Sequence, residues 1–206
     1  MINSQINGIF QTPVYRTRLT QDFSKKQLFF INKSRKGIKR NQGGNSDSCK
    51  KNVLDEKIFK SIKQELNLIV EDYFEKIIFP SDNITPYITQ SWLNYTETNQ
   101  IHHTHNHVNS YISGVLYINC HKTLDTIKFY REGYNTIQPA VKEYNPYNSN
   151  NWWFRVNTKD VILFPSSLSH GVDSKKGNNT RISLSFNVFL KGTCGVYSEA
   201  TELTLK

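Results

Sequence analysis

From residue 87 onward, short apolar runs alternate with clusters of Asn, Gly, Ser and Thr. Runs that are rich in Ile, Val, Tyr and Phe are typical of β-strands, and the polar clusters between them are typical of turns. Many short strands in succession favour a sandwich or a barrel, so a mainly β fold with flanking helices is expected. The expected strands cover residues 87–95, 101–107, 110–119, 126–130, 152–156, 160–165 and 181–190.

The N-terminal part of the chain follows a different pattern. Apolar side chains recur every three or four positions over 55–78, which predicts an amphipathic helix. Upstream of this helix, we expect an edge strand over 9–19 and a short helix over 20–33. The polar, glycine-containing stretch 36–51 is interpreted as a loop.

At 206 residues, the chain is long enough for one domain with a sizeable core. We expect a single domain over 1–206, in which residues 1–80 supply a strand and helical support and residues 85–195 form the β core. Edge strands could pair between two copies of the chain, so a homodimer is one expectation for its assembly.

The chain has a formal net charge of +9, and much of the excess lies between Lys33 and Lys51. A basic surface attracts polyanions without sequence preference, so a nucleic-acid patch is one interpretation of this segment. A solvated loop with excess lysine is the other interpretation, and it is the one that we favour.

The sequence contains no run of about 20 apolar residues, the length that spans a bilayer. Its first residues have neither the cationic region nor the apolar run of a signal peptide. Its three cysteines are far apart and form no evident disulfide framework and no zinc-like spacing. We therefore expect a cytoplasmic protein without a membrane partner.

Four of the six histidines lie between residues 102 and 107. On a strand, residues two apart point to the same side, so His103, His105 and His107 are expected to share one face and His102 the other. Two imidazoles on one face of a strand can bind the same metal ion. Either His105 with His107 or His103 with His105 has this spacing.

His170 is the candidate for a third metal ligand. It follows the apolar run 160–165, so it is expected at the mouth of a cavity rather than in the middle of a core. A lone histidine in this place would more often be structural, but the upstream pair of histidines favours a ligand. Three protein ligands leave coordination positions open, which catalysis requires.

The strand that begins at Arg181 has two faces of different character, because Arg181, Ser183 and Ser185 alternate with apolar residues. If Arg181 faces the inside of a barrel, it needs an anion. A dicarboxylate cosubstrate would supply one in bidentate geometry. The alternative is an exposed arginine that pairs with a surface carboxylate.

Together, these motifs resemble the 2-oxoglutarate/Fe(II) oxygenase superfamily. The histidine pair is followed by Ser-Gly-Val-Leu-Tyr at 113–117, by Leu-Phe-Pro-Ser at 163–166 and by Arg-Ile-Ser-Leu-Ser-Phe-Asn at 181–187. The resemblance covers nearly the whole chain and is strongest to a group of oxygenases from bacteria and their phages that is related to prolyl hydroxylases. It implies a double-stranded β-helix, which is a cupin-like jelly roll.

The resemblance implies an Fe(II) site in which the histidine motif supplies two ligands and His170 the third. His105 and His107 are preferred as the pair over His103 and His105. With this choice, Asn109-Ser110 and Ser113-Gly114 follow the histidine pair at the sequence spacing expected in the most similar branch. Most members of the superfamily carry a carboxylate where this chain has His107.

The resemblance also implies a binding site for the cosubstrate 2-oxoglutarate. Arg181 and Ser183 match the pair that binds its far carboxylate. Tyr117 lies where prolyl hydroxylases have a tyrosine that hydrogen-bonds the same group, and Asn94 is a further candidate. The implied reaction uses O₂, releases succinate and CO₂ and hydroxylates a C–H bond of the substrate.

The substrate itself is not identified by the sequence. A peptide, a protein or a small molecule is expected, and a nucleic acid is less favoured. The aromatic residues of one segment could frame a substrate groove or could pack between strands. These residues are Tyr134, Tyr144, Tyr147, Trp152 and Trp153.

Three other functions fit parts of the pattern. A cupin-type metalloenzyme without a cosubstrate suits three histidines but has no need of Arg181 and Ser183. A basic β module that binds nucleic acid would leave the histidines without a role. A structural zinc site is disfavoured because no cysteine lies near the histidines at 102–107 or near His170.

Overall fold

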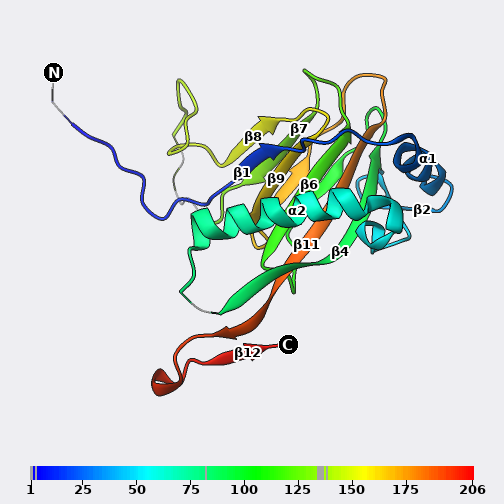
Figure 1. The fold of residues 1–206 in the computed structure, drawn as a ribbon. Helices are drawn as coiled ribbons and strands as arrows, with labels where there is room; N and C mark the ends of the chain where they lie inside the picture. The colour runs from blue at the N-terminus through cyan, green and yellow to red at the C-terminus, as the bar shows by residue number, and fades with distance from the viewer. Residues whose placement is uncertain (1, 3, 82, 134–136, 138) are drawn as a thin grey trace.

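The computed structural model describes residues 2, 4–81, 83–133, 137 and 139–206. Within this part of the chain, antiparallel strands form two sheets (Figure 1). The larger sheet contains β1 (Tyr15–Arg18), β2 (Ile38–Arg40), β3 (Ser46–Ser48), β4 (Ile84–Thr96), β6 (Ile112–Asn119), β9 (Asp160–Pro165), β11 (Arg181–Cys194) and β12 (Leu203–Leu205). The smaller sheet contains β5 (His102–His105), β7 (Thr126–Tyr130), β8 (Asn151–Arg155) and β10 (His170–Val172).

The strand β11 lies in the middle of the larger sheet, whose order is β1-β9-β6-β11-β4-β3-β2, with β12 paired to β11. It pairs with β4 from Arg181 to Gly192 and with β6 from Ile182 to Val188. The smaller sheet has the order β5-β10-β7-β8. Because β5 and β10 are neighbours, the histidine-rich segment and His170 lie side by side.

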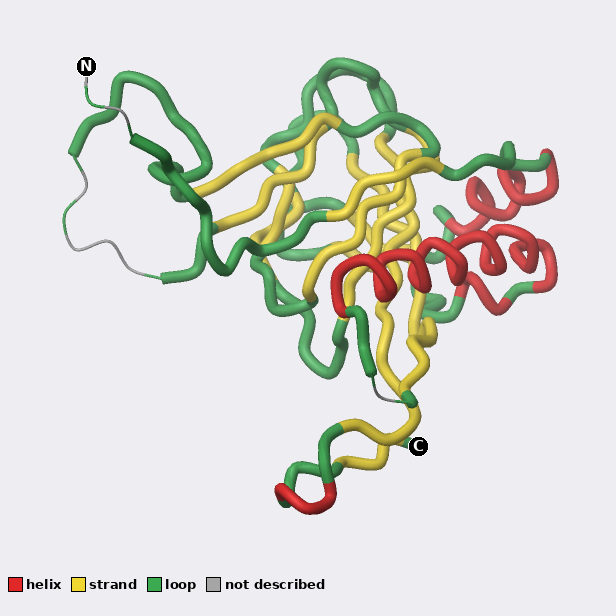
Figure 2. Tube along the Cα trace, turned by 60° about the vertical axis from the view of Figure 1, so that its left-hand side comes forward, coloured by secondary structure: helices red, strands yellow, loops and turns green. Residues whose placement is uncertain are grey.

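Helices cover one side of the larger sheet (Figures 1 and 2). The helix α2 (Lys60–Tyr73) runs across this face and buries its apolar stripe, which includes Ile62, Leu66 and Val70. The helix α1 (Lys25–Ser34) begins with a capping box, in which Ser24 and Gln27 bond each other's backbone N–H groups.

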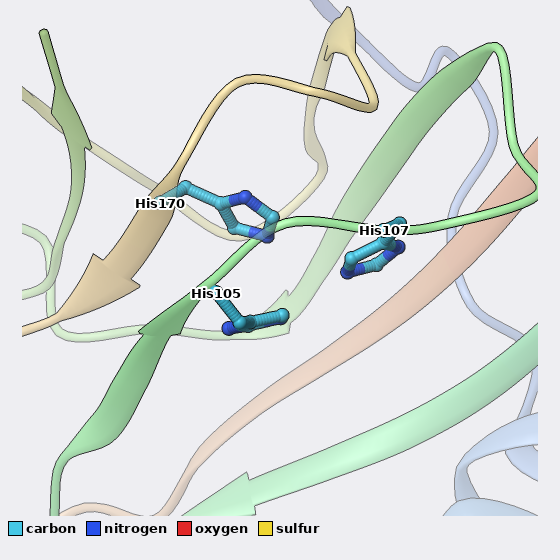
Figure 3. A group of neighbouring side chains, drawn as sticks. All are labelled: His105, His107 and His170. Atoms are coloured by element: carbon cyan, nitrogen blue, oxygen red, sulfur yellow. The ribbon is translucent and has the colours of Figure 1, made fainter. Parts of the chain in front are cut away.

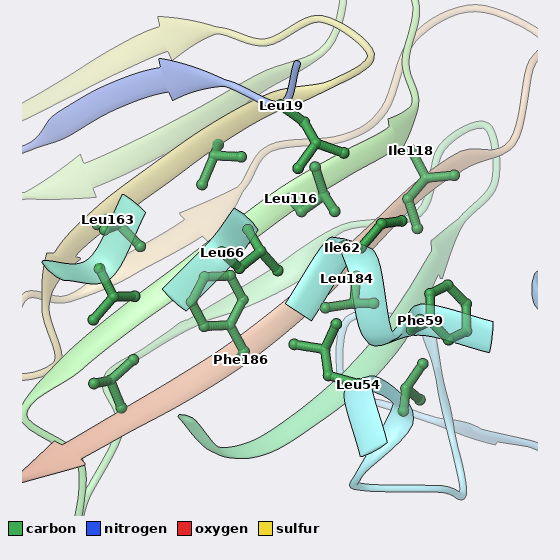
Figure 4. Close-up of a cluster of buried hydrophobic side chains, with 14 of the residues drawn as sticks. Leu19, Leu54, Phe59, Ile62, Leu66, Leu116, Ile118, Leu163, Leu184 and Phe186 are labelled. Atoms are coloured by element: carbon green, nitrogen blue, oxygen red, sulfur yellow. The ribbon is translucent and has the colours of Figure 1, made fainter. Parts of the chain in front are cut away.

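The alternation along β11 divides its side chains between two environments. Leu184 and Phe186 are fully buried and belong to the apolar core that also contains Leu66 of α2 (Figure 4). Arg181 and Ser183 point to the other side of the sheet, where they line a cavity. One strand therefore contributes both to the helix-side core and to a polar cavity.

A second, smaller apolar cluster joins the two sheets. It combines Tyr117 of β6 and Phe164 of β9 with Ile127 and Phe129 of β7. Two facing antiparallel sheets with this core between them form the double-stranded β-helix, or jelly roll, that was expected from the sequence. The described part of the chain has no helix that is long and apolar enough to cross a membrane.

All seven strands that were expected from the apolar runs are present. The bounds of β7 and β9 are those predicted. The strands β4 and β11 extend beyond the predicted 87–95 and 181–190, because they continue to pair with each other as far as Ile84 and Gly192. The pair projects from the body of the molecule together with β12 (Figure 1).

The predictions for the N-terminal part need correction. Only residues 15–18 of the expected strand 9–19 form β1, although it is an edge strand as expected. The interpretation of 36–51 as a loop is wrong, because this stretch contains β2 and β3. Both strands are short and polar, so they carry no apolar signal, and β3 forms by pairing with β4.

The predicted helix 55–78 is interrupted at both ends. Two 3-10 turns, Val53–Asp55 and Lys57–Phe59, precede α2, and a π turn, Phe74–Ile78, follows it. The short helix expected over 20–33 starts later, after the cap at Ser24. The strands β10 and β12 were not expected, because three-residue strands are too short to show a period.

We expect Gly114→Ala to destabilise the protein. Gly114 of β6 lies opposite Phe186 of β11, and a Cβ atom at this position would lie 2.2 Å from Cζ of the Phe186 ring. Overpacking of a core typically costs about 1–3 kcal/mol. Urea denaturation should show a lower midpoint for Gly114→Ala than for the wild type. In a Gly114→Ala/Phe186→Leu double variant the two losses should be less than additive, and strict additivity would contradict this account.

Candidate metal centre

Three histidines lie close to one another (Figure 3) and line the cavity between the sheets. His105 ends β5 and is paired directly with His170, the first residue of β10. His107 follows in the segment after β5, where its backbone N–H donates to the carbonyl oxygen of Ser166. The candidate ligand nitrogens all lie within 4.8 Å of one another, so the three side chains could hold one metal ion.

Hydrogen bonds orient each of these imidazole rings. The Nδ1 atoms of His105 and His170 lie 2.8 and 3.0 Å from the carbonyl oxygens of His103 and Leu168, and Nδ1 of His107 lies 2.6 Å from Oδ1 of Asn187. These oxygen atoms only accept hydrogen bonds, so each Nδ1 carries the proton. The Nε2 atom of each ring is therefore unprotonated. In this tautomer its lone pair can bind a metal ion.

Burial keeps the three rings neutral. Desolvation is the main cause that lowers the pKa of His105 to about 4 and that of His170 to about 3, and it also lowers the pKa of His107. A metal ion binds the neutral imidazole. At neutral pH no proton has to be displaced from this site.

The prediction that His102 and His105 lie on opposite faces of a strand is wrong. His170 pairs with His105, but Val172 pairs with His102, so β5 contains one extra residue at this point. Such a bulge shifts the alternation of side chains. His102 consequently lies on the same side as His105, with the two rings stacked at 4.7 Å, and both line the cavity.

The structure brings the predicted cosubstrate residues into the same cavity as the three histidines. Arg181, Ser183, Tyr117 and Asn94 all line it. The backbone of Ser183 is paired with Asn94 on one side and with Tyr117 on the other. Arg181 is only 5% exposed, and its Nη1 donates to the carbonyl oxygen of Thr126 of the smaller sheet at 2.9 Å.

Several polar atoms in this part of the cavity are buried without a partner among the described residues. They are the Tyr117 hydroxyl, Nε of Arg181 and Oδ1 of Asn94. An unpaired buried polar group costs about 1–3 kcal/mol, so these atoms are suited to a ligand that pairs with them. Burial raises the pKa of Tyr117, which therefore remains a hydroxyl donor. No Asp or Glu occurs among the described residues that line the cavity, so an anionic ligand would meet no repulsion there.

Sequence reasoning missed several residues that support the centre. Asn187 and Ser113 contact Nδ1 of His107, and Ser113 also hydrogen-bonds Ser166 at 2.8 Å. Trp92 packs beside His107, with ring centroids 5.5 Å apart. Asn187 could have been found by continuing the alternation of Arg181, Ser183 and Ser185 to the next residue on the same face of the strand. Ser113 begins one of the motifs that carry the resemblance, but no role was predicted for it or for Trp92.

The aromatic segment lies mainly at the surface. Trp152 and Trp153 of β8 are 40% and 51% exposed, and Tyr144 and Tyr147 are also exposed. Packing between strands, which was one interpretation of this segment, is therefore not their main role. Tyr134 lies outside the described residues.

The fold is thus a double-stranded β-helix. The cavity between its two sheets contains a candidate metal site of three histidines and a buried arginine. Residues 90–187 match the model of a family described as "Putative 2OG-Fe(II) oxygenase". This match covers the part of the chain that contains the three histidines and Arg181, and it shows that this part is similar to the 2-oxoglutarate/Fe(II) oxygenases. No curated protein matches the chain.

Solved structures with the same fold are distant in sequence. A prolyl-4-hydroxylase from Pseudomonas putida is 10% identical, with a TM-score of 0.57 over 85% of this chain and 92% of that one. A prolyl hydroxylase from Trichoplax adhaerens, in complex with a peptide fragment, is 12% identical, with a TM-score of 0.56 over 85% and 83%. HygX from Streptomyces hygroscopicus, with nickel, 2-oxoglutarate and hygromycin B bound, is 11% identical, with a TM-score of 0.53 over 86% and 82%.

We expect Asn187→Ala to weaken metal binding by about 10- to 100-fold, because His107 loses the acceptor that orients its ring. His170→Ala should abolish binding to this centre. The measurement is calorimetric titration of the chelator-treated protein with Co(II). His121→Ala is the matched control, since His121 is a histidine outside the cluster. Unchanged affinity in both Asn187→Ala and His170→Ala would show that the cluster does not hold the metal.

Proposed function

We propose that the protein is a 2-oxoglutarate- and Fe(II)-dependent hydroxylase whose iron is held by His105, His107 and His170. One observation carries this proposal: the three clustered histidines and the residues with unpaired buried polar atoms around Arg181 line the same cavity. The two groups of residues suit the two ends of one ligand, which chelates the metal with its keto acid and pairs with Arg181 through its far carboxylate.

The residues at the Arg181 end would bind the far carboxylate of 2-oxoglutarate. Arg181 supplies the positive charge, and its position is fixed by the bond to Thr126. The Tyr117 hydroxyl and the Ser183 hydroxyl would add hydrogen bonds, and Asn94 lies beside them with its Nδ2 bonded to Ser185. All four side chains are almost fully buried, so water competes little with the ligand.

Bound Fe(II), together with 2-oxoglutarate and O₂, would supply an oxidation that yields succinate and CO₂ and hydroxylates the substrate. The protein's residues orient the reactants and exclude water. Phe164 and Val115 form part of an apolar wall of the cavity, and Phe164 packs against the His170 ring at 4.6 Å. No side chain needs to act as a general base in this scheme.

The substrate class that we propose is a peptide segment, a protein or a small molecule. The solved structures with this fold include complexes with a peptide fragment and with hygromycin B, which are the two kinds of ligand that this proposal includes. The exposed Trp152 and Trp153 of β8 offer a contact surface for such a substrate, because β8 belongs to the same sheet as His105 and His170.

The structure disfavours the rival functions. A metalloenzyme without a cosubstrate would have no use for an arginine that is buried in the metal cavity with an unpaired Nε. A surface ion pair, the other interpretation of Arg181, is wrong because the side chain is buried. A module that binds nucleic acid would not require three clustered histidines whose rings are oriented by hydrogen bonds.

We expect an anaerobic titration of the protein with Fe(II) and then 2-oxoglutarate to produce a visible charge-transfer band. Arg181→Ala should weaken binding of 2-oxoglutarate by about 10- to 100-fold, because a charge-assisted pair in a buried site is lost. Its Fe(II) affinity should remain that of the wild type. Arg18→Ala, which removes an exposed arginine of β1, is the matched control.

Two outcomes would contradict the proposal. If the wild type binds iron but gives no band with 2-oxoglutarate, the enzyme does not use this cosubstrate. If the wild type binds no iron, the three histidines have another role.

A further inference from the structure

His102 is a fourth histidine of the cavity, and it differs from the three candidate ligands. The bulge in β5 turns its ring to the inner side, where it stacks on His105 at an interplanar angle of 27°. It is not part of the group whose ligand nitrogens lie within 4.8 Å of one another. His102 is paired with Val172, and it lies further along the chain from His107 than His105 does.

The His102 ring makes no side-chain hydrogen bond in the described part of the chain, whereas Nδ1 of each candidate ligand is bonded to an oxygen atom. Nothing therefore fixes its tautomer for metal binding. A neutral imidazole has one donor and one acceptor, and both are available to a ligand in His102.

The surroundings of His102 specify the chemistry of that ligand. The cavity is lined by His102 and Val172 from the smaller sheet and by Tyr117, Ser183 and Arg181 from the larger one. No carboxylate of the described chain lines it, so the His102 N–H can find an anionic acceptor only on a bound molecule. His102 and Arg181 line the same cavity as the three histidines, so an anion bound in this cavity can be reached from both.

We propose that His102 donates a hydrogen bond to the bound 2-oxoglutarate and is a cosubstrate-binding residue, not a metal ligand. This inference rests on the proposed function. A neutral imidazole adds a donor to the cavity without adding a second charge beside Arg181. The bulge in β5 would then serve binding, because a regular strand would turn His102 away from the cavity.

The test compares His102→Phe with His102→Gln. The Phe variant keeps a planar ring but loses the donor, and the Gln variant keeps a donor. Metal affinity is measured by titration with Co(II), and cosubstrate affinity by the Fe(II)–2-oxoglutarate band under anaerobic conditions. We expect His102→Phe to bind metal within about threefold of the wild type and 2-oxoglutarate roughly tenfold more weakly. His102→Gln should recover part of the cosubstrate affinity.

Retained metal binding shows that the variants fold, so each remaining outcome is informative. A loss of Co(II) affinity in His102→Phe as large as that of His170→Ala would make His102 a metal ligand and would overturn the inference. Unchanged 2-oxoglutarate affinity in His102→Phe would also overturn it. A wild type that binds iron but no 2-oxoglutarate would instead refute the proposed function, and the two failures are therefore distinguishable.

Discussion

The two-sided character of β11 is the constraint on which the rest of the structure depends. Its even-numbered residues form the apolar surface under α2, and its odd-numbered residues from Arg181 to Asn187 face the cavity. A shift of one residue in its pairing would exchange the two faces, so that a guanidinium would lie against Leu66 and Phe186 would enter the cavity. Burial of the apolar face of β11 thus stabilises the core and also fixes the pairing register that places its polar residues in the cavity.

Regular strands explain why much of this architecture could be predicted. Alternation with a period of two is a local property, and it correctly placed Arg181 and Ser183 on the inner face of β11. The side chains of Tyr117 and Asn94 meet Ser183 because their strands pair with β11 in register. Periodicity alone cannot show that residues as far apart as His105 and His170 belong together. This prediction came from the histidine pair and the apolar run before His170, and the resemblance supported it.

The features that could not be predicted are those that depend on a distant partner. The bulge in β5 exists only in its pairing with β10, and it places His102 on the side opposite to the predicted one. A register shift between Asn187 and Val188 interrupts the pairing of β11 with β4 where the Asn187 amide reaches His107. Bulges change the direction in which side chains point near active sites. The position of a bulge cannot be predicted from the local amino-acid composition. The short polar strand β3 likewise forms because β4 offers it an edge.

The proposed ligand set of three neutral imidazoles has a consequence for metal selectivity. No hard, anionic oxygen ligand accompanies His105, His107 and His170 among the described residues of the cavity. Nitrogen sites of this kind follow the Irving–Williams order, in which Zn²⁺ and Cu²⁺ bind more tightly than Fe²⁺. Such a centre cannot select iron by ligand type. The metal that it carries in the cell would therefore be decided by the concentrations of free ions at the time the chain folds, and mismetallation would be a route to inactive protein.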